Sequence, residues 1–421
     1  MSFKTISVIG LGYIGLPTAA MFASRKKKVI GVDVNQHAID TINRGEIHIV
    51  EPDLDMIVHA AVSEGYLRAT NIAEPADAFL IAVPTPFKDS DSDIPEPDLK
   101  YIEAAAKSIA PALKKGDLVI LESTSPVGAT EQLADWLADI RGDLSFPQTS
   151  GEQADINVAH CPERVLPGHV VRELVENDRV IGGMSAKCSE RAIELYKTFV
   201  KGECVVTNAR TAEMVKLTEN SCRDVQIAFA NELSIICDKL EINVWELISL
   251  ANRHPRINIL QPGPGVGGHC IAVDPWFIVS KTPEEAQIIH TARKINDAKP
   301  EWVINKVKIA ISDFLQANPD KTAKDVVIAC YGLAFKANID DLRESPALEI
   351  TREVNALHSG HVIAVEPNVE ALPDSFEGVR LESYEFAKQK ADLHLLLVAH
   401  KEFKENQPES NYIVDTQGLW N

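Results

Sequence analysis

The chain has 421 residues, of which 45% are apolar and 24% charged, and its formal net charge is −19. This length is sufficient for two or three globular domains, and the negative charge argues against nucleic acid, whose phosphates would be repelled. Seven cysteines without C-x-x-C spacing, a first expected strand close to Met1 and the lack of a membrane-spanning apolar run predict a cytoplasmic protein that does not act at a membrane.

The N-terminal segment predicts a dinucleotide site. A strand is expected at Thr5–Ile9, followed directly by Gly10-Leu11-Gly12-Tyr13-Ile14-Gly15 and a helical pattern. In this strand–turn–helix context the glycines permit close approach of a pyrophosphate to a helix N-terminus. The next expected strand, 29–32, ends at Asp33, whose carboxylate can accept hydrogen bonds from ribose hydroxyls. An acid at this position favours NAD over NADP.

Further strands are expected at 78–83, 118–122, 156–160 and 179–182, with helical patterns between them. This alternation predicts an α/β fold with a Rossmann-type, doubly wound parallel sheet. Ligands bind at the carboxyl ends of such strands, where the chain continues as Pro84-Thr85-Pro86, Glu122-Ser123-Thr124 and Cys161-Pro162-Glu163-Arg164. Glu163 is interpreted as an acid, a base or a group that positions water, and its alternative is a surface carboxylate paired with Arg164.

Residues 211–240 contain neither Pro nor Gly and predict a helix about 45 Å long, interpreted as a buried spine. Glu213, Lys216, Asn220 and Arg223 are spaced to lie along one face. This face is either the solvated side of an amphipathic helix or the wall of a cleft. In a cleft, Lys216 and Asn220 would donate hydrogen bonds to a developing negative charge.

The run Pro262–Cys270 is too rich in Gly and Pro for a helix or strand, so Cys270 is expected on a tight, accessible loop. This setting favours a nucleophilic thiol over a buried structural cysteine. Arg256 precedes the loop and suits phosphate or carboxylate recognition, and Asp274 follows it. A further helical pattern at 284–316 is expected to break at Pro300.

The last hundred residues predict a second, smaller α/β domain without a second G-x-G-x-x-G. Strands are expected at 326–331, 361–365, 393–398 and 413–415, and a helix is expected to begin at Ser345-Pro346. The expected division is 1–205 for a dinucleotide-binding domain, 206–320 for a helical middle and 321–421 for a substrate-binding α/β domain, with a cleft between the outer two. No histidine pairing suggests a metal.

Taken in order, several motifs resemble the nucleotide-sugar 6-dehydrogenases of the UDP-glucose/GDP-mannose dehydrogenase family. They are Gly10–Gly15, Thr85 in VPTP, the EST at 122–124, Pro162-Glu163, Lys216 and Asn220 in K-x-x-x-N, the GGHC that ends at Cys270, and the FK that ends at Lys336. The segments ERVLPG, ANRHPRINIL and NIDDLRESPA resemble the branch of this family that oxidises UDP-N-acetylmannosamine. UDP-glucose enzymes usually carry Glu-Phe at the first of these segments, where this chain has Arg164 after the glutamate. They also usually carry a lysine shortly after the cysteine, where this chain has Val273.

The resemblance implies a four-electron oxidation of a sugar C6 alcohol to an acid, with two NAD consumed and a thiohemiacetal and thioester formed on Cys270. It implies catalytic roles for Cys270, Lys216, Asn220, Glu163 and Asp274. Implied NAD contacts are Gly10, Gly12, Tyr13, Ile14, Gly15, Asp33, Thr85, Thr130 and Arg343. Implied contacts to the UDP-sugar are Arg164, Val165, Lys216, Asn220, Arg223, His254, Arg256, Gly267, Phe335 and Lys336. It further implies at least a homodimer, and a product that supplies bacterial surface polysaccharides such as enterobacterial common antigen.

Other functions remain open from the residues alone. UDP-N-acetylglucosamine or UDP-glucose are alternative substrates of the same chemistry. A two-electron β-hydroxyacid-type dehydrogenase would share the glycine motif and the helical lysine but would need no thiol. A NAD-binding sensor without turnover would be insensitive to replacement of Cys270.

Overall fold

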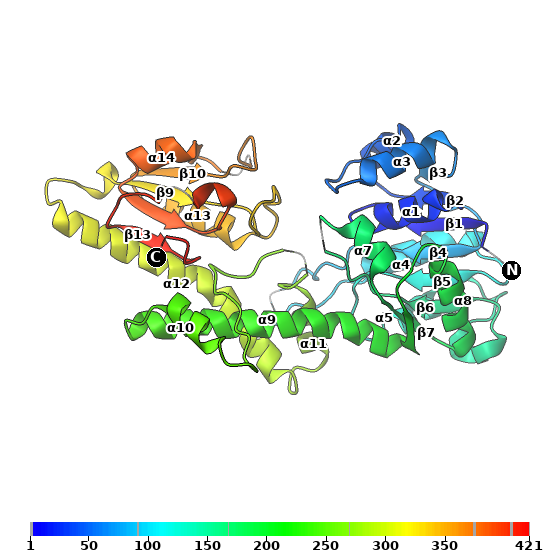
Figure 1. Ribbon diagram of the computed structural model, residues 1–421. Helices are drawn as coiled ribbons and strands as arrows, with labels where there is room; N and C mark the ends of the chain where they lie inside the picture. The colour runs from blue at the N-terminus through cyan, green and yellow to red at the C-terminus, as the bar shows by residue number, and fades with distance from the viewer. Residues whose placement is uncertain are drawn as a thin grey trace. The chain divides into compact units, whose positions relative to one another are not determined.

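The computed structural model describes residues 3–90, 92–166, 168–268, 270–373, 376–404 and 407–420 (Figure 1). His269 of the GGHC motif and Pro167 of ERVLPG lie outside the described residues. The chain divides into two compact units. Unit 1 comprises Met1–Glu219 with Trp276–Lys281, and unit 2 comprises Asn220–Pro275 with Thr282–Asn421. None of the described helices is both long and apolar enough to cross a membrane.

The described residues of unit 1 form an eight-stranded sheet of order β3-β2-β1-β4-β5-β6-β7-β8. Its strands are β1 (Thr5–Ile9), β2 (Lys28–Val32), β3 (Leu67–Thr70), β4 (Ala78–Ile81), β5 (Leu118–Leu121), β6 (Asn157–His160), β7 (Arg179–Gly183) and β8 (Cys204–Asn208). Its helices are α1 (Gly15–Ser24), α2 (Gln36–Asn43), α3 (Leu54–Ser63), α4 (Lys100–Ile109), α5 (Ala129–Ile140), α6 (Pro147–Ser150), α7 (Val170–Glu176) and α8 (Ala186–Tyr196).

Helices cover both faces of this sheet, as the doubly wound pattern predicts. On one face, Leu16 of α1 and Leu195 of α8 pack in one apolar core, and on the other Ile102 of α4 and Leu133 of α5 pack in a second. The strands are apolar on both faces because neither face meets water. The Rossmann-type fold is therefore confirmed.

Two features of the sheet differ from the expectation. Strands β3 and β8 were not predicted: β3 (LRAT) alternates apolar and polar residues, and β8 (CVVTN) has an apolar run of three residues only. Strand β7 pairs antiparallel with β6, so that His160 lies opposite Gly182. The start of β7 therefore lies at the edge of the sheet where β6 ends.

The long helix α9 (Ala209–Lys239) continues from unit 1 into unit 2. The interpretation of α9 as a buried spine is only partly right. Leu217 and Cys237 are buried, but Phe229 is 51% and Ile236 45% exposed. These two residues are seven positions apart and share a face of the helix, opposite to the face that packs within the chain.

Three further helices follow: α10 (Val244–Ala251), α11 (Asp274–Lys281) and α12 (Gln287–Ala317). The break expected at Pro300 is wrong, because α12 passes through this proline. Pro300 has no N–H to donate, but the helix on either side of it is held by packing. Asn296 is buried in a polar network with α9, and Val303 is buried in the C-terminal core.

The C-terminal part of unit 2 forms a five-stranded parallel sheet of order β11-β10-β9-β12-β13. Its strands are β9 (Val327–Tyr331), β10 (His361–Val365), β11 (Arg380–Leu381), β12 (Leu393–Leu396) and β13 (Ile413–Asp415), and its helices are α13 (Pro346–Leu357) and α14 (Tyr384–Lys390). Ser345 caps α13 by accepting a hydrogen bond from the Leu348 amide, as the sequence predicts. The second, smaller α/β domain is confirmed.

Candidate active site

The glycine loop after β1 is shaped for the close approach of a ligand. Gly10 has φ +88°, and a Cβ there would lie 2.5 Å from the carbonyl oxygen of Ala82. A Cβ on Gly15 would lie 1.8 Å from the carbonyl oxygen of Gly10. A Cβ on Gly12, in contrast, would meet no described atom within 4 Å. Gly10 and Gly15 are thus required by the fold, whereas Gly12 leaves open space in front of the first amides of α1.

Two polar side chains beside this loop fit a dinucleotide. The carboxylate of Asp33 accepts hydrogen bonds from the amides of Leu11 (2.7 Å) and Asn35 (2.8 Å), which fix its orientation and leave acceptor capacity for ribose hydroxyls. The hydroxyl of Thr85 is buried and has no hydrogen-bond partner among the described residues. A buried hydroxyl of this kind fits a bound group that would complete its hydrogen bonding.

Thr130 lies in a different setting from the other predicted NAD contacts. Its hydroxyl donates to Oε1 of Glu213 at 2.6 Å, and the amides of Thr130 and Gly128 donate to the same carboxylate. Glu213, only 1% exposed, thereby caps the N-terminus of α5. The idea that Glu213 shares an accessible polar face with Lys216 is therefore wrong, and the NAD contact of Thr130 stays a prediction.

Glu163 is not a surface carboxylate paired with the Arg164 side chain. It is 8% exposed, and its Oε2 lies 2.9 Å from the Arg179 guanidinium. Arg164 contacts Glu163 through its backbone amide, which donates to Oε1 at 2.7 Å. The side chain of Arg164 instead pairs with Glu219 of α9 at 2.5 Å.

In unit 2, the turn that carries Cys270 is tied to α9. The amides of Val273 and Asp274 donate to the carbonyl of Cys270 at 3.0 and 2.9 Å, and the thiol-bearing residue itself is exposed. Asp274 is 2% exposed and accepts a hydrogen bond from Nδ2 of Asn220 at 2.6 Å. These hydrogen bonds thus bring together three predicted catalytic residues, Asn220, Cys270 and Asp274. Lys216, one turn before Asn220 on α9, is half-buried.

The glycines before Cys270 permit close packing against the C-terminal domain. A Cβ on Gly267 would lie 3.0 Å from Cβ of Phe335, and one on Gly268 would lie 3.3 Å from its ring. The amide of Gly268 donates to the carbonyl of Glu344 at 3.3 Å. Gly267 and Phe335, both predicted substrate contacts, therefore lie side by side.

A buried polar network that the sequence did not predict supports the same loop. Asn231 of α9 accepts from the amide of Gly263 at 2.9 Å and donates to Asn296 of α12 at 2.9 Å. Asn296 donates in turn to Asp224 at 2.8 Å, which is paired with Arg293 at 2.6 Å. The four side chains are at most 1% exposed. Polar residues in an otherwise apolar helix were the signal available for this network.

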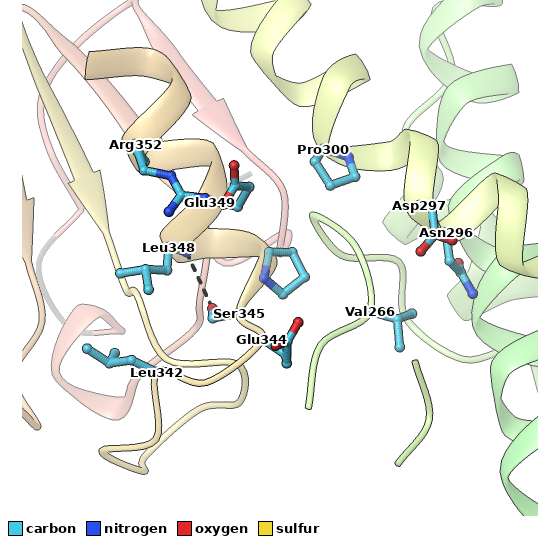
Figure 2. Close-up of a pocket in the computed structure, with 11 residues that line it drawn as sticks. Val266, Asn296, Asp297, Pro300, Leu342, Glu344, Ser345, Leu348, Glu349 and Arg352 are labelled. Atoms are coloured by element: carbon cyan, nitrogen blue, oxygen red, sulfur yellow. Dashed lines mark hydrogen bonds and ion pairs between the residues drawn. The ribbon is translucent and has the colours of Figure 1, made fainter. Parts of the chain in front are cut away.

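A cavity of about 390 Å³ lies in unit 2 between α12, the start of α13 and the loop that contains Val266 (Figure 2). Its charged lining groups are Asp297, Glu344, Glu349 and Arg352, and Arg352 is paired with Glu349. None of the predicted site residues lines it.

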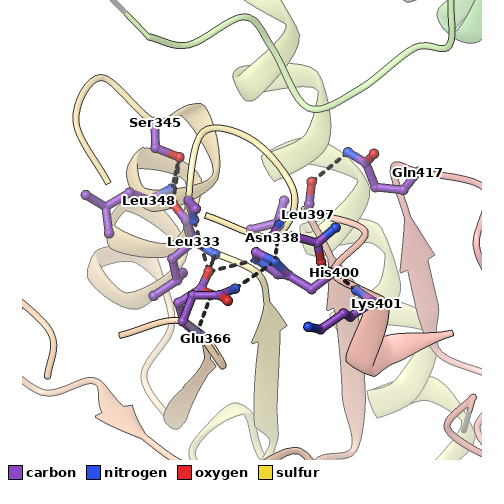
Figure 3. A network of polar contacts seen from close by, with 11 residues as sticks. Leu333, Asn338, Ser345, Leu348, Glu366, Leu397, His400, Lys401 and Gln417 are labelled. Carbon is purple, nitrogen blue, oxygen red and sulfur yellow. Dashed lines mark hydrogen bonds and ion pairs between the residues drawn. The ribbon is translucent and has the colours of Figure 1, made fainter. Parts of the chain in front are cut away.

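A second unpredicted cluster surrounds Glu366, directly after β10 (Figure 3). Its Oε2 accepts from the amides of Leu333 (2.7 Å) and Ala334 (3.1 Å) and contacts Nε2 of His400 at 3.0 Å. Because the amide of Asn338 can only donate to Nδ1 of His400, Nε2 carries the proton that His400 donates to Glu366. Burial alone would raise the pKa of Glu366, but these hydrogen bonds outweigh it and lower the pKa to about 2.

The remaining predicted substrate and cofactor residues are largely accessible. Exposed residues are Gly12, Tyr13, Arg223, His254, Arg256, Lys336 and Arg343, and partly buried ones are Ile14, Val165 and Phe335. Arg343 is paired with Asp341 at 2.6 Å. Their contacts to ligands stay predictions.

A glycine loop shaped for a dinucleotide, with an acid at the end of the next strand, is typical of oxidoreductases that transfer a hydride to a nicotinamide cofactor. Models of three successive domains of one family match the chain. The NAD-binding domain matches residues 4–200, the central domain 210–298 and the UDP-binding domain 329–421. The chain therefore belongs to the UDP-glucose/GDP-mannose dehydrogenase family, and its cofactor is NAD.

Individual relatives cover the whole chain. It is 68% identical over its full length to the full-length UDP-N-acetyl-D-mannosamine dehydrogenase of Yersinia pestis. It is 64% identical, over its full length and 97% of the relative, to an NDP-N-acetyl-D-galactosaminuronic acid dehydrogenase of Ralstonia solanacearum. Among solved structures, a UDP-D-ManNAc dehydrogenase from Pyrococcus horikoshii matches with a TM-score of 0.86 and 39% identity, over 99% of this chain and 96% of the other.

Proposed function

We propose that the protein oxidises C6 of UDP-N-acetyl-D-mannosamine to give UDP-N-acetyl-D-mannosaminuronate, through a covalent intermediate on Cys270. The observation that carries the mechanism is the exposed Cys270 on a turn whose other end, Asp274, is bonded to Asn220. Full-length identity of 68% to a UDP-N-acetyl-D-mannosamine dehydrogenase supports the choice of sugar. The predicted division at residues 205 and 320 assigns NAD to the first domain and the UDP moiety to the last.

NAD supplies the hydride acceptor for each of the two oxidations. The first hydride leaves C6 of the alcohol and the hydroxyl proton passes to Lys216, which gives the aldehyde. The Cys270 sulfur adds to the aldehyde carbon and the thiol proton moves to the C6 oxygen, which gives a thiohemiacetal. Loss of a second hydride from C6, with the proton on the C6 oxygen again passing to Lys216, converts this to a thioester. Lys216 and Asn220 donate hydrogen bonds to the oxygen on C6 as it gains negative charge. Glu163 accepts a proton from the water whose oxygen attacks the thioester carbonyl. The C–S bond then breaks, and its electron pair returns to sulfur.

The test of mechanism is stoichiometry with matched variants. Wild-type enzyme should form two NADH per acid released, whereas Cys270→Ala should form no acid and still bind the UDP-sugar. A single NADH per product would contradict the proposal and favour a two-electron dehydrogenase. Unchanged acid formation by Cys270→Ala would exclude the covalent route. Cys222→Ala is the matched control, because Cys222 is also an exposed thiol.

The second candidate substrate is an N-acetylgalactosamine nucleotide, which the 64% identity to the Ralstonia enzymes supports. NAD reduction against a panel of UDP-linked hexoses separates the candidates. The panel should contain the N-acetylated manno, galacto and gluco forms together with UDP-glucose. Preference for the manno form by kcat/KM is expected. Preference for UDP-glucose would contradict the sugar assignment and leave the mechanism intact.

We also propose a cytoplasmic homodimer whose interface includes α9 and α10, with a product that supplies surface polysaccharide synthesis. Phe229 and Ile236 lie on one face of α9 and are 51% and 45% exposed. Leu240, directly after α9, is 61% exposed, and Leu250 of α10 is 57% exposed. An apolar face of this kind is typical of a protein interface. Light scattering should give twice the chain mass for wild type and the single mass for Phe229→Glu/Ile236→Glu. Leu357→Glu, an exposed leucine on α13, is the control.

A further inference from the structure

A buried cluster of ionisable groups lies at the carboxyl edge of the large sheet in unit 1. It consists of Glu122, Glu163, Arg179 and Tyr196, which are 1%, 8%, 4% and 0% exposed. Of these, the proposed reaction uses only Glu163. Buried charged groups are costly unless they are paired, so the other three call for an explanation.

Strand pairing explains how the cluster is assembled. Strands β5 and β6 are parallel with Leu121 opposite His160, so Glu122 follows at the level of Cys161. Strands β6 and β7 are antiparallel with His160 opposite Gly182. Continuing that register places Arg179 at the level of Glu163. Because β7 runs antiparallel to β6, Arg179 at the start of β7 lies at this edge of the sheet.

The contacts place one guanidinium between two carboxylates. Arg179 lies 2.9 Å from Oε2 of Glu163 and 3.9 Å from Oε1 of Glu122. The Tyr196 hydroxyl donates to Oε1 of Glu122 at 2.6 Å, and its ring lies 4.7 Å from the Arg179 guanidinium carbon. The second oxygen of Glu122 has no hydrogen-bond partner among the described residues.

The charges of this cluster cannot all be balanced when both carboxylates are ionised. Burial raises the pKa of Glu122 to about 7, which the negative charge of Glu163 supports and Arg179 and Tyr196 oppose. Cys161 also interacts with Glu122, and burial raises the pKa of this thiol to about 12. A pKa of about 7 means that Glu122 changes charge near neutral pH.

We propose that Glu122, Arg179 and Tyr196 are positioning residues that set the orientation and the charge environment of Glu163 for thioester hydrolysis. When Glu122 is protonated, Glu163 is the one carboxylate among the described residues that balances the charge of Arg179. When Glu122 loses its proton, the guanidinium is shared between two carboxylates, and the additional negative charge makes Glu163 a stronger proton acceptor. The inference rests on the proposed role of Glu163 as the group that takes a proton from the attacking water.

The test isolates hydrolysis from the two oxidations. Wild-type enzyme, UDP-N-acetylmannosamine and NAD are mixed and quenched, and the acyl-enzyme is followed by mass spectrometry of the intact protein. We expect the decay of the thioester to accelerate between pH 6 and pH 8, by about three- to tenfold, as Glu122 ionises. Glu122→Gln, which keeps the shape and the acceptor for Tyr196, should remove this acceleration and leave the first NADH burst unchanged.

Tyr196→Phe tests the same role of Glu122 by shifting the pH at which it ionises. Loss of the hydroxyl removes a hydrogen bond that favours ionised Glu122, so the midpoint of the pH profile should rise by about half a unit to one unit. Tyr331→Phe is the matched control, because Tyr331 is a buried tyrosine of the C-terminal sheet whose hydroxyl bonds to His394 at 2.8 Å. It should leave the midpoint unchanged.

The possible outcomes separate this inference from the proposed function. If Glu163→Gln accumulates the thioester but Glu122→Gln and Tyr196→Phe keep the wild-type pH profile, the support cluster is merely structural and the inference is overturned. If Glu163→Gln hydrolyses the thioester normally, the role of Glu163 fails and the inference fails with it. If Glu122→Gln does not fold, the shift in Tyr196→Phe decides.

Discussion

The two sheets of this protein carry an acid at the same position, after the strand next to the central one, but the two acids have different surroundings. In each, a glycine with positive φ follows the first strand (Gly10, +88°, and Gly332, +84°), and an acid follows the neighbouring strand. Asp33 accepts a hydrogen bond from the amide of Leu11 at 2.7 Å, and Glu366 accepts one from the amide of Leu333 at 2.7 Å. Both acids therefore hold the loop that follows the central strand.

The difference lies in what else reaches each carboxylate. Asp33 is half-buried and keeps acceptor capacity, whereas Glu366 is 3% exposed and also bonds to His400 and Asn368. An acid saturated by its own chain cannot accept ribose hydroxyls. An acid at the end of the second strand thus does not by itself indicate a dinucleotide site. The indication is that its carboxylate oxygens can still accept hydrogen bonds from a ligand. Exchanging or removing these acids is the way to test the comparison.

The largest expected effect is on stability, in Glu366→Ala. This change leaves the amides of Leu333 and Ala334 and the His400 ring without their buried acceptor, which should lower the free energy of unfolding by about 3–5 kcal/mol. Asp33→Ala, in the equivalent position, should change it by less than about 1 kcal/mol. Urea unfolding of both variants, followed by fluorescence, measures the contrast. Equal losses would show that the two acids have the same structural role.

The free energy of unfolding at acid pH tests the structural role of Glu366 in a second way. The pKa of Glu366 is lowered to about 2, so the ionised carboxylate stabilises the folded state above its unfolded pKa. This contribution, about 3 kcal/mol, is lost as the pH falls from about 4.5 toward 2. Unfolding free energies of wild type and Glu366→Gln should therefore converge in acid. A constant difference between them down to pH 2 would contradict this account.

Much of the fold could be predicted because its strands are buried on both faces and read as apolar runs. Thr5–Ile9, His361–Val365 and Ile413–Asp415 match in both bounds. Edge strands such as Leu67–Thr70 could not be found this way, because only one of their faces is buried. Pro300 misled because tertiary packing on both sides holds α12 together at a position where local chemistry favours a break.

The site divides in the same way. Accessibility of Cys270 could be predicted, since a loop dense in Gly and Pro exposes its residues. The hydrogen bond between Asn220 and Asp274 could not be predicted, because the two residues are 54 positions apart along the chain. The role of Arg179 could not be predicted, because it depends on β7 running antiparallel to β6, which the local sequence does not encode. His400 was missed because its partner, Glu366, is 34 residues away along the chain.

A smaller effect, on binding instead of stability, is expected for Asp33→Ala. Loss of a charged acceptor for the ribose hydroxyls should raise the dissociation constant for NAD by about 10- to 100-fold. Asp40→Ala is the control, since Asp40 is an exposed acid on the following helix. Titration calorimetry with NAD measures both. An unchanged affinity in Asp33→Ala would remove the argument that free acceptors mark the dinucleotide site.

The smallest effect, on both stability and NAD affinity, is expected for Gly12→Ala. This variant separates the space that a ligand would occupy from the space that the folded chain needs. A Cβ at Gly12 meets no described atom within 4 Å, whereas a Cβ at Gly332 of the other sheet would lie 2.4 Å from Cβ of Val398. Gly12→Ala should therefore leave the unfolding free energy within about 0.5 kcal/mol of wild type, and Gly332→Ala should lower it by about 2 kcal/mol or more.

The same methyl group on Gly12 should weaken NAD binding by roughly threefold to tenfold, because it occupies space through which a pyrophosphate would approach the amides of α1. Gly332→Ala lies in a loop whose neighbouring acid, Glu366, is already hydrogen-bonded within the chain, so it should alter NAD affinity only as far as it unfolds the protein. Calorimetric titration well below the unfolding temperature separates these effects. If Gly12→Ala bound NAD as tightly as wild type, the open space at this glycine would have no bearing on the cofactor.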